Sequence, residues 1–359
     1  MRIFYSIVLV FSVLLNSCDT DDSTTSYDTS TDTSNTDADD TSNSDDDDTS
    51  NSDDDDTSNS DDDDTSNSDD DDTSNSDDDD DDDTSNSDNN ASSETGVLDL
   101  TLSHDGMTRS YIVYVPTSYD GTAAVPILFN FHGFGDSDSG YMQYADMRAL
   151  ADSENFILVY PQGSLLNGSS HWNAALLGGD NKSSADDLGF FEAMLENVSD
   201  TYQIDANRVY ACGYSNGGMF AYALACYKSN LIAAFGSVSG VVLDTSETCV
   251  PSHATPLINI HGTNDGVLPY NGSSDYSSVA DALNYWRGVN NTTTSSSDSS
   301  NDNGTTIEQY LYTGGDNGSS VVHYKVIGGG HVWFDMEYNG ASTGKLVWDF
   351  VSQYSLREL

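Results

Sequence analysis

Hydrophobic and polar positions alternate in two short segments, residues 98–102 and 109–115. They flank a turn at His104-Asp105-Gly106, so the alternation predicts a pair of antiparallel strands. Beyond them, apolar runs typical of strands alternate with longer segments of helical pattern. The expected strands are residues 125–131, 156–160, 208–212, 233–238, 256–261, 307–312 and 321–326. The expected helices are residues 142–155, 186–202, 219–226, 279–289 and 343–354. This order predicts an α/β fold with a mostly parallel central sheet and helices on both faces.

The first 18 residues do not share this pattern. Residues 3–15 are an apolar run after Met1-Arg2 that is too short to span a bilayer, which is typical of an export signal. The run ends at Leu15-Asn16-Ser17-Cys18, which resembles the lipobox of bacterial lipoproteins. Residues 1–18 are therefore expected to be a lipoprotein-type signal peptide with Cys18 lipidated, and an ordinary signal peptide with an incidental cysteine stays open. Both interpretations predict an exported protein, lipid-anchored to a bacterial cell envelope or secreted.

Residues 19–94 are of low complexity, and the unit Thr-Ser-Asn-Ser-Asp-Asp-Asp-Asp recurs in them. Dense like charge and scarce apolar residues predict a disordered acidic spacer, with cation binding or glycan attachment as alternative roles. The spacer holds 33 of the 61 acidic residues and no basic residue, and residues 95–359 still carry a net charge of −19. This charge argues against nucleic-acid binding and against docking on anionic lipid, so membrane contact is expected only through Cys18.

The stretch Gly213-Tyr214-Ser215-Asn216-Gly217-Gly218 joins an apolar strand to an Ala-rich helix. A serine exposed at such a turn needs a strained backbone, and the residues two before and two after it must lack side chains. The pattern therefore indicates a nucleophile elbow with Ser215 as the nucleophile. A glycine-rich turn without chemistry is the plainer alternative.

Polar residues also follow three other predicted strands, where functional loops of parallel sheets collect. Asp265 follows strand 256–261, and His331 follows strand 321–326. A serine nucleophile needs a base and a group that orients the base. The chain order Ser215, Asp265, His331 is the one used by α/β sheets with a nucleophile elbow. His132 and His261 also end strands and are rival bases, although such histidines more often shape their loops. The rival acids, which follow no apolar strand directly, are Asp244, Asp275 and Asp335.

Two backbone amides are expected to hold the oxyanion of an acyl-transfer intermediate. One belongs to Asn216, directly after the nucleophile. The other belongs to Phe134, whose neighbours Gly133 and Gly135 let the backbone approach a substrate. A plain glycine turn is the alternative for this second loop.

Several motifs in order resemble the α/β-hydrolase esterases grouped with polyhydroxybutyrate depolymerases and with the feruloyl and acetylxylan esterases of carbohydrate esterase family 1. They are His132-Gly-Phe-Gly135, Tyr160-Pro-Gln-Gly163 with Trp172-Asn173, Asp186-Asp-Leu-Gly-Phe190, the elbow from Tyr210 to Met219, His261 to Asp265 with Pro269-Tyr270, and Gly329-Gly-His-Val-Trp333. The resemblance covers nearly all of residues 96–359 and implies an α/β-hydrolase fold with Ser215, Asp265 and His331 as the triad. It also implies a disulfide between Cys226 and Cys249, which suits an oxidising compartment. Cys212 is expected to be a buried free thiol.

Within this resemblance, Trp172 and Trp333 are candidate walls of the substrate site, with a place in the core as the equal alternative. Phe334 stands where the family usually has proline. Residues 290–306, rich in Ser, Thr and Asn, are expected to form an inserted flexible loop, either a lid or a tolerated surface insertion. No Cys and His cluster has metal-ligand spacing and no nucleotide loop appears, so neither a metal nor a cofactor is expected.

The sequence therefore predicts a serine carboxylic ester hydrolase whose partner is an ester substrate, with feruloyl or acetyl esters of plant polysaccharides favoured. A polyhydroxybutyrate-type polyester depolymerase is the alternative within the family. A non-catalytic surface binding protein on a hydrolase scaffold is the alternative from another class.

Overall fold

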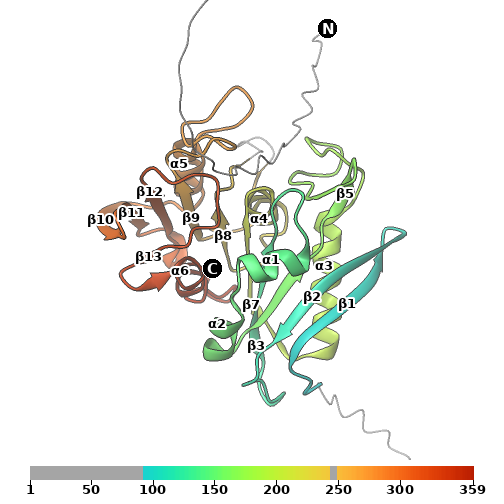
Figure 1. Cartoon of the computed structure of the whole chain (residues 1–359). Helices are drawn as coiled ribbons and strands as arrows, with labels where there is room; N and C mark the ends of the chain where they lie inside the picture. The colour runs from blue at the N-terminus through green and yellow to red at the C-terminus, as the bar shows by residue number, and fades with distance from the viewer. Residues whose placement is uncertain (1–91, 243–248) are drawn as a thin grey trace, which may run out of the picture. The chain divides into compact units, whose positions relative to one another are not determined.

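The computed structural model describes residues 92–242 and 249–359, which form one central sheet with helices around it (Figure 1). The ten strands of this sheet follow the order β1-β2-β4-β3-β7-β8-β9-β12-β11-β10. From β4 to β12 neighbouring strands run parallel, and an antiparallel pair closes each edge. The strands are β1 Gly96–His104, β2 Met107–Val115, β3 Val125–Phe131, β4 Ile157–Pro161, β7 Ile204–Tyr214, β8 Ala234–Val238, β9 Leu257–Gly262, β10 Thr294–Asp302, β11 Thr305–Thr313 and β12 Val321–Val326. The mostly parallel α/β architecture expected from the sequence is confirmed.

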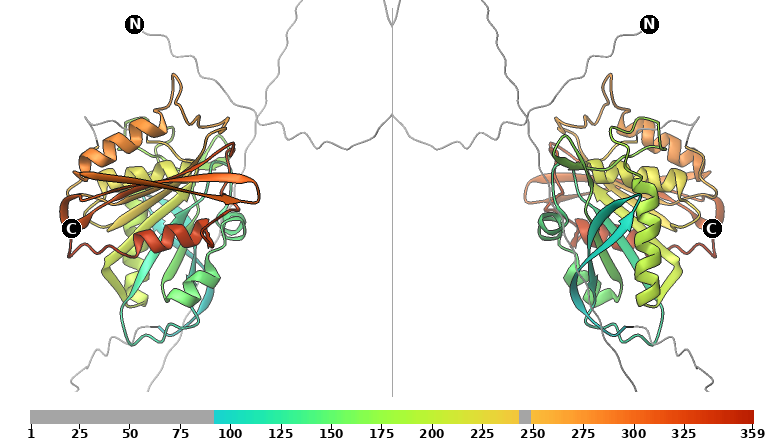
Figure 2. Two further views of the ribbon diagram at one scale, coloured as in Figure 1. Left: turned by 90° about the vertical axis from the view of Figure 1, so that its left-hand side faces the viewer. Right: turned by 90° about the vertical axis from the view of Figure 1, so that its right-hand side faces the viewer.

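Helices lie on both faces of the sheet (Figure 2). They are α1 Asp138–Tyr144, α2 Arg148–Glu154, α3 Asp187–Thr201, α4 Asn216–Tyr227, α5 Val279–Val289 and α6 Thr343–Val351, with a 3-10 turn η1 at Asp316–Gly318. One apolar core joins the sheet to α3, α4 and α5, and the other joins it to α1, α2 and α6. Because strand side chains alternate, Ile127 and Phe129 of β3 enter the first core and Leu128 enters the second.

The predicted single helix over residues 142–155 is wrong, because the chain forms α1 and α2 with a break between them. The buried side chain of Tyr160 satisfies the backbone at this break. Its hydroxyl accepts the N–H of Met147 at 3.1 Å and donates to the carbonyl of Ala145 at 2.8 Å. These two bonds give partners to two backbone groups that the broken helix leaves without a helical bond.

Residues 290–306 are not the flexible insertion that their composition suggests. Residues 294–302 form β10, which pairs antiparallel with β11 over its whole length, and Asn303 and Gly304 make the turn with positive φ angles of 48° and 90°. A two-residue Asn-Gly turn of this kind favours a tight hairpin. Side chains of β10 also reach the short sheet β13 (Glu337–Tyr338) and β14 (Ala341–Ser342), since Asp298 accepts the hydroxyl of Tyr338. The stretch is an edge strand rather than a lid.

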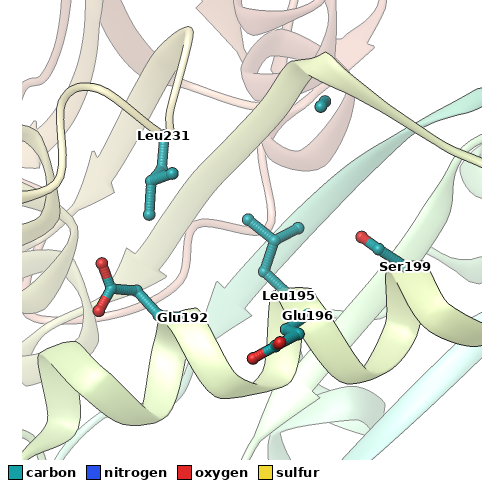
Figure 3. A pocket seen from close by; sticks show the side chains of 6 residues that line it. Glu192, Leu195, Glu196, Ser199 and Leu231 are labelled. Atoms are coloured by element: carbon teal, nitrogen blue, oxygen red, sulfur yellow. The ribbon is translucent and has the colours of Figure 1, made fainter.

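A cavity of about 350 Å³ opens at the amino end of β7, where Glu192, Leu195, Glu196 and Ser199 of α3 face Ala206 and Leu231 (Figure 3). Ser215 follows the opposite, carboxyl end of the same strand. The cavity therefore lies a full strand length away from the residues of the predicted nucleophile elbow. In residues 92–242 and 249–359, no helix has the length and apolar character needed to cross a membrane.

Candidate active site

Ser215 lies between the end of β7 and the start of α4, in a backbone conformation that side chains rarely adopt. Its φ is 54° and its ψ is −119°. The turn is held by two backbone bonds: Ser215 N–H donates to Val238 O of β8 at 2.9 Å, and Ser215 O accepts the N–H of Met219 at 2.9 Å. Strain of this kind persists only where the surrounding structure fixes it, and it raises the serine hydroxyl above the sheet edge.

No side chain fits at the glycines two residues before and two residues after Ser215. A Cβ on Gly217 would lie 2.1 Å from the carbonyl oxygen of Phe131 and 2.6 Å from that of His132. A Cβ on Gly213 would lie 2.4 Å from the carbonyl carbon of Gly217. Strand β3, strand β7 and helix α4 therefore approach closer than any side chain allows, as the sequence pattern predicts for an elbow.

The structure brings Ser215, His331 and Asp265 into one hydrogen-bonded line. His331 Nε2 lies 2.7 Å from Ser215 Oγ, and His331 Nδ1 lies 2.7 Å from Asp265 Oδ2. The carboxylate of Asp265 is fully buried, whereas 13% of the His331 side chain is exposed. With Nδ1–H donating to the carboxylate, Nε2 is free to accept the serine proton.

Asp265 is held by donors on both of its oxygens. Oδ1 accepts the amides of Val267 and Leu268 at 2.8 Å each, while Oδ2 faces His331 and, at 3.2 Å, His261 Nε2. Burial alone raises the pKa of Asp265, but its hydrogen bonds with His261, His331 and Leu268 outweigh burial and hold the pKa well below its usual range. The group is therefore a carboxylate at neutral pH.

The loop that carries His331 packs directly on the end of β9. A Cβ on Gly262 would lie 2.2 Å from the carbonyl oxygen of Gly329, and the N–H of Asn264 donates to that same oxygen at 2.9 Å. The hydroxyl of Tyr214 donates to the carbonyl of His331 at 2.9 Å. These contacts fix the positions of Asp265, His331 and Ser215 relative to one another.

The loop after β3, which carries the predicted second oxyanion donor, lies beside the elbow. A Cβ on Gly133 would be 3.4 Å from the Cβ of Ser215, and Gly135 N–H donates to Ser170 O at 2.8 Å. Among the described residues, the amide of Phe134 donates to no protein acceptor. Asn216 is the first residue of α4, where amides lack an acceptor within the helix. Both amides are thus available for an oxyanion.

His132 shapes this loop instead of acting on a substrate. The imidazole is buried, its Nδ1 donates to Gly133 O at 2.6 Å, and its Nε2 accepts the N–H of Gly163 at 2.9 Å. Burial lowers the pKa of His132, which keeps the ring neutral. Of the rival acids, Asp275 and Asp335 are exposed in loops, and Asp244 lies outside the described residues.

The two tryptophans proposed as substrate walls are buried. Trp172 is 2% exposed, stacks on Phe220 and donates its indole N–H to the carbonyl of His132 at 3.0 Å. Trp333 is 9% exposed and lies edge-on to Tyr141. Trp172 has no open face for a sugar or phenolic group, and its indole N–H instead supports the backbone at His132, where the loop after β3 begins.

Two exposed aromatic side chains that flank the site are better candidates for the walls of a substrate site than the two tryptophans. Phe134 on the loop after β3 is 53% exposed, and Tyr144 at the end of α1 is 48% exposed. The ring of Tyr144 lies edge-on to Tyr214, and its hydroxyl accepts the N–H of Trp333 at 3.0 Å. The sequence pattern gave no signal for Tyr144, because an aromatic residue in a predicted helix is more often part of the core.

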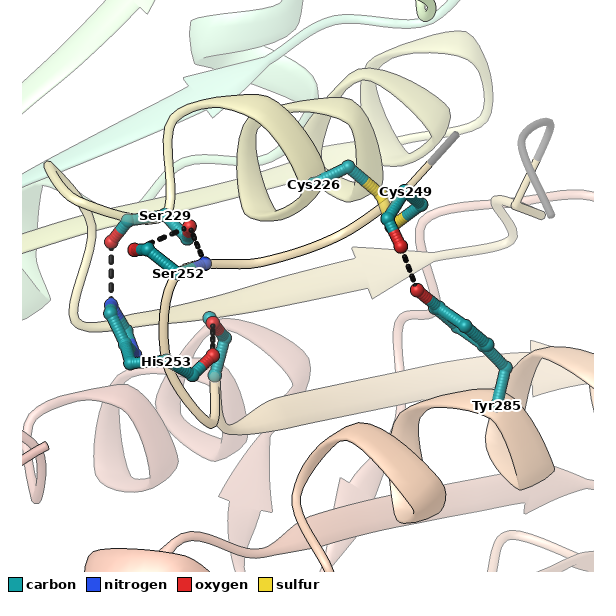
Figure 4. Close-up of a disulfide and its surroundings, with 7 residues drawn as sticks. Cys226, Ser229, Cys249, Ser252, His253 and Tyr285 are labelled. Carbon is teal, nitrogen blue, oxygen red and sulfur yellow. Dashed lines mark hydrogen bonds between the residues drawn. A yellow bond between two sulfur atoms is a disulfide. The ribbon is translucent and has the colours of Figure 1, made fainter. Parts of the chain in front are cut away.

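A disulfide joins Cys226 at the end of α4 to Cys249 in the loop before β9 (Figure 4). The hydroxyl of Tyr285 on α5 donates to the carbonyl of Cys249. Cys212 on β7 is a buried free thiol whose pKa is raised by burial, and it lies 3.3 Å from Asn130 Oδ1. In the part of the chain that the structure describes, no group of three or more His, Cys, Asp or Glu side chains has metal-binding geometry.

The sheet order, the strained serine on the turn after β7 and the line of Ser215, His331 and Asp265 define an α/β-hydrolase. The family model for phospholipase/carboxylesterase proteins matches residues 117–313, which is more than half of the chain. The chain therefore belongs to the phospholipase/carboxylesterase family.

Among curated relatives, a bifunctional acetylxylan esterase/xylanase of Neocallimastix patriciarum is 35% identical over 167 residues, covering 46% of this chain and 22% of the relative. Feruloyl esterase B of Piromyces equi is 27% identical over 261 residues, covering 69% of this chain and 46% of the relative. The chain thus spans less than half the length of either relative. The matches confirm the resemblance to feruloyl and acetylxylan esterases.

Solved structures agree on the fold. An acetyl xylan esterase from Aspergillus awamori gives a TM-score of 0.51 at 16% identity, covering 66% of this chain and 94% of that one. A feruloyl esterase module from Clostridium thermocellum gives a TM-score of 0.50 at 14% identity, covering 76% and 92%. At these identities the likeness concerns the fold alone.

Proposed function

We propose that this chain is a serine carboxylic ester hydrolase that acts through an acyl-enzyme on Ser215. The observation that carries the proposal is the hydrogen-bonded line from Ser215 through His331 to the buried carboxylate of Asp265. A serine hydroxyl is a weak nucleophile at neutral pH, and a base within hydrogen-bond reach activates it. The family membership supports the same chemistry.

The proposed mechanism assigns the proton transfers to His331. His331 Nε2 removes the proton from Ser215 Oγ as the oxygen attacks the ester carbonyl, and Asp265 stabilises the imidazolium that results. The carbonyl oxygen becomes an oxyanion, to which the amides of Phe134 and Asn216 donate. His331 then protonates the leaving alcohol oxygen, and an acyl-enzyme remains. Water, deprotonated by His331, then attacks the acyl-enzyme. The free acid leaves, and His331 returns the proton to Ser215 Oγ.

Feruloyl or acetyl esters of polysaccharides are the substrates we propose. The named activities of the two curated relatives support this class. The exposed rings of Phe134 and Tyr144 also support it, because aromatic faces bind phenolic acyl groups and sugars through their apolar surface. Burial of Trp172 removes it from this role.

We further propose that the enzyme is exported. Residues 1–18 act as the signal, Cys18 as the lipid anchor, residues 19–94 as the spacer and residues 95–359 as the esterase domain. The Cys226–Cys249 disulfide supports an oxidising compartment, where such bonds persist. Metabolic labelling with a palmitate analogue tests the anchor, since labelling lost in Cys18→Ala supports it and unlabelled wild type refutes it.

A hydrolysis panel on the full chain tests the activity. The esters are methyl ferulate, acetylated xylan, short nitrophenyl esters and hydroxybutyrate oligomers, with Ser215→Ala beside wild type. Ser199→Ala, which changes an exposed serine in the distant cavity, is the matched control. We expect release of ferulate or acetate that Ser215→Ala abolishes and Ser199→Ala leaves intact. Preference for hydroxybutyrate would reassign the substrate to polyesters, and no turnover of any ester by folded protein would refute the catalytic proposal in favour of a binding scaffold.

A further inference from the structure

His261 contacts the acid of the site, although the proposed reaction gives it no task. The residue is the second-to-last of β9, and its side chain is fully buried. Its Nε2 lies 2.9 Å from the carbonyl oxygen of Leu268 and 3.2 Å from Asp265 Oδ2. Both neighbours are acceptors, so Nε2 carries a proton and points it between them.

We propose that His261 is a positioning residue that holds both oxygens of Asp265 in place. Its Nε2 lies 3.2 Å from Oδ2. It also binds the carbonyl of Leu268, the residue whose own N–H donates to Oδ1 at 2.8 Å. One imidazole thus fixes the whole turn from Asp265 to Leu268 against the end of β9.

The opposite edge of the ring shows that His261 is neutral. Within the described residues, its buried Nδ1 has no hydrogen-bond partner. A proton on Nδ1 would bury an unpaired N–H donor, which costs more than leaving an acceptor unpaired. The side chain is therefore the Nε2–H tautomer, which donates to the acid without adding a charge beside His331.

Neighbouring side chains hold this ring in its orientation. Tyr270 lies edge-on to His261, with ring centroids 6.0 Å apart, and its hydroxyl donates to His323 Nε2 at 2.9 Å. His323 Nδ1 lies 3.3 Å from the carbonyl oxygen of Asn259 on β9. The contacts from His261 through Tyr270 and His323 therefore end at Asn259, on the same strand as His261. They hold the His261 ring in one position.

The inference rests on the proposed function, because it assigns His261 a task only if Asp265 acts on His331. Loss of the His261 donor leaves the Asp265 turn less constrained and the line to His331 less well aligned. A hydrogen bond to a charged group is roughly twice as strong as one between neutral groups. His261 divides its proton between two acceptors, so we expect a fall in kcat of about 10-fold, with KM little changed.

The test measures the rate at which a fluorophosphonate probe labels Ser215 in the full chain, together with steady-state kcat and KM. The variants are His261→Phe, which removes the donor, and His261→Gln, whose amide N–H reaches toward the same acceptors. If His261→Phe does not fold, His261→Asn replaces it, since its shorter amide reaches neither acceptor. We expect about 10-fold slower labelling and kcat for the donor-less variant, and rates within about 3-fold of wild type for His261→Gln.

A double-mutant cycle separates positioning from a general structural role. In an Asp265→Ala background, replacing His261 is expected to cost nothing further, because the group through which it acts is gone. An equal loss in that background would overturn the inference, and so would His261→Phe that folds and labels as fast as wild type. No labelling of Ser215 in folded wild type would instead refute the proposed function itself, and this inference with it.

Discussion

The substitution Gly217→Ala isolates the steric requirement of the elbow. Gly217 does not have a positive φ angle, so alanine fits its backbone conformation and the only obstacle is space. The added Cβ would meet the carbonyl oxygens of Phe131 and His132 at 2.1 and 2.6 Å. Ordinary carbon to oxygen contacts are about 3.3 Å or longer, so roughly 1 Å of overlap must be relieved by moving backbone.

Moving backbone at this point displaces the parts of the site together. Phe131 and His132 lead into the oxyanion loop, and Gly217 is in the first turn of α4. Overpacking of this kind typically costs 1–3 kcal/mol and more where rigid backbone is struck, so we expect about 3 kcal/mol or more of lost stability. The fraction that folds is expected to lose activity as well.

Urea unfolding of the full chain, followed by tryptophan fluorescence, measures this loss. Gly288→Ala in α5 is the matched control, because nothing lies within 4 Å of its added Cβ and its φ is not positive. That control is expected to be stabilised by up to about 1 kcal/mol through helix propensity. A free energy of unfolding for Gly217→Ala within about 0.5 kcal/mol of wild type, with an unchanged denaturant slope, would refute the steric requirement.

Three further predictions follow from the geometry. Replacing Cys226 and Cys249 by serine is expected to lower the free energy of unfolding by about 3 kcal/mol, given the sequence separation of 23, and equal urea midpoints would contradict this. Burial lowers the pKa of His323 to about 3, so below pH 6.5 the unfolded state binds a proton that the folded state does not. Stability is therefore lost as pH falls, by about 3 kcal/mol between pH 6.5 and 4, and His323→Gln is expected to show a visibly smaller loss in the same titration. Asp265→Asn is expected to lower kcat by about 10⁴-fold while Asp335→Asn, in an exposed loop, keeps wild-type kinetics.

The sequence predicted the elements whose signals are local. The elbow follows from glycine spacing around Ser215, and the positions of Asp265 and His331 follow from the rule that parallel strands end at one edge of the sheet. Both signals are readable without knowing which residues meet in space. The polar edge strand at residues 294–302 was missed because its exposed Ser, Thr and Asp side chains show no apolar alternation. The Asn303-Gly304 pair was the available signal for the hairpin.

Features that depend on tertiary burial were not predictable. Trp172 lies in the core because Phe220 and the carbonyl of His132 take up its face and its indole N–H. The break between α1 and α2 depends on the hydroxyl of Tyr160, which comes from a strand later in the chain. The place of His261 beside Asp265, rather than as a rival base, and the contact of Tyr144 with Trp333 depend on distances that the sequence does not contain.

The most direct test of the account is to trap the acyl-enzyme. Full-length protein is mixed with a nitrophenyl acetate, quenched in acid during turnover and mapped by peptide mass spectrometry. We predict one acetyl group on Ser215, and none at that position in Ser215→Ala or His331→Ala. Acetyl transfer to another residue, or ester turnover that continues unchanged in Ser215→Ala, would contradict it.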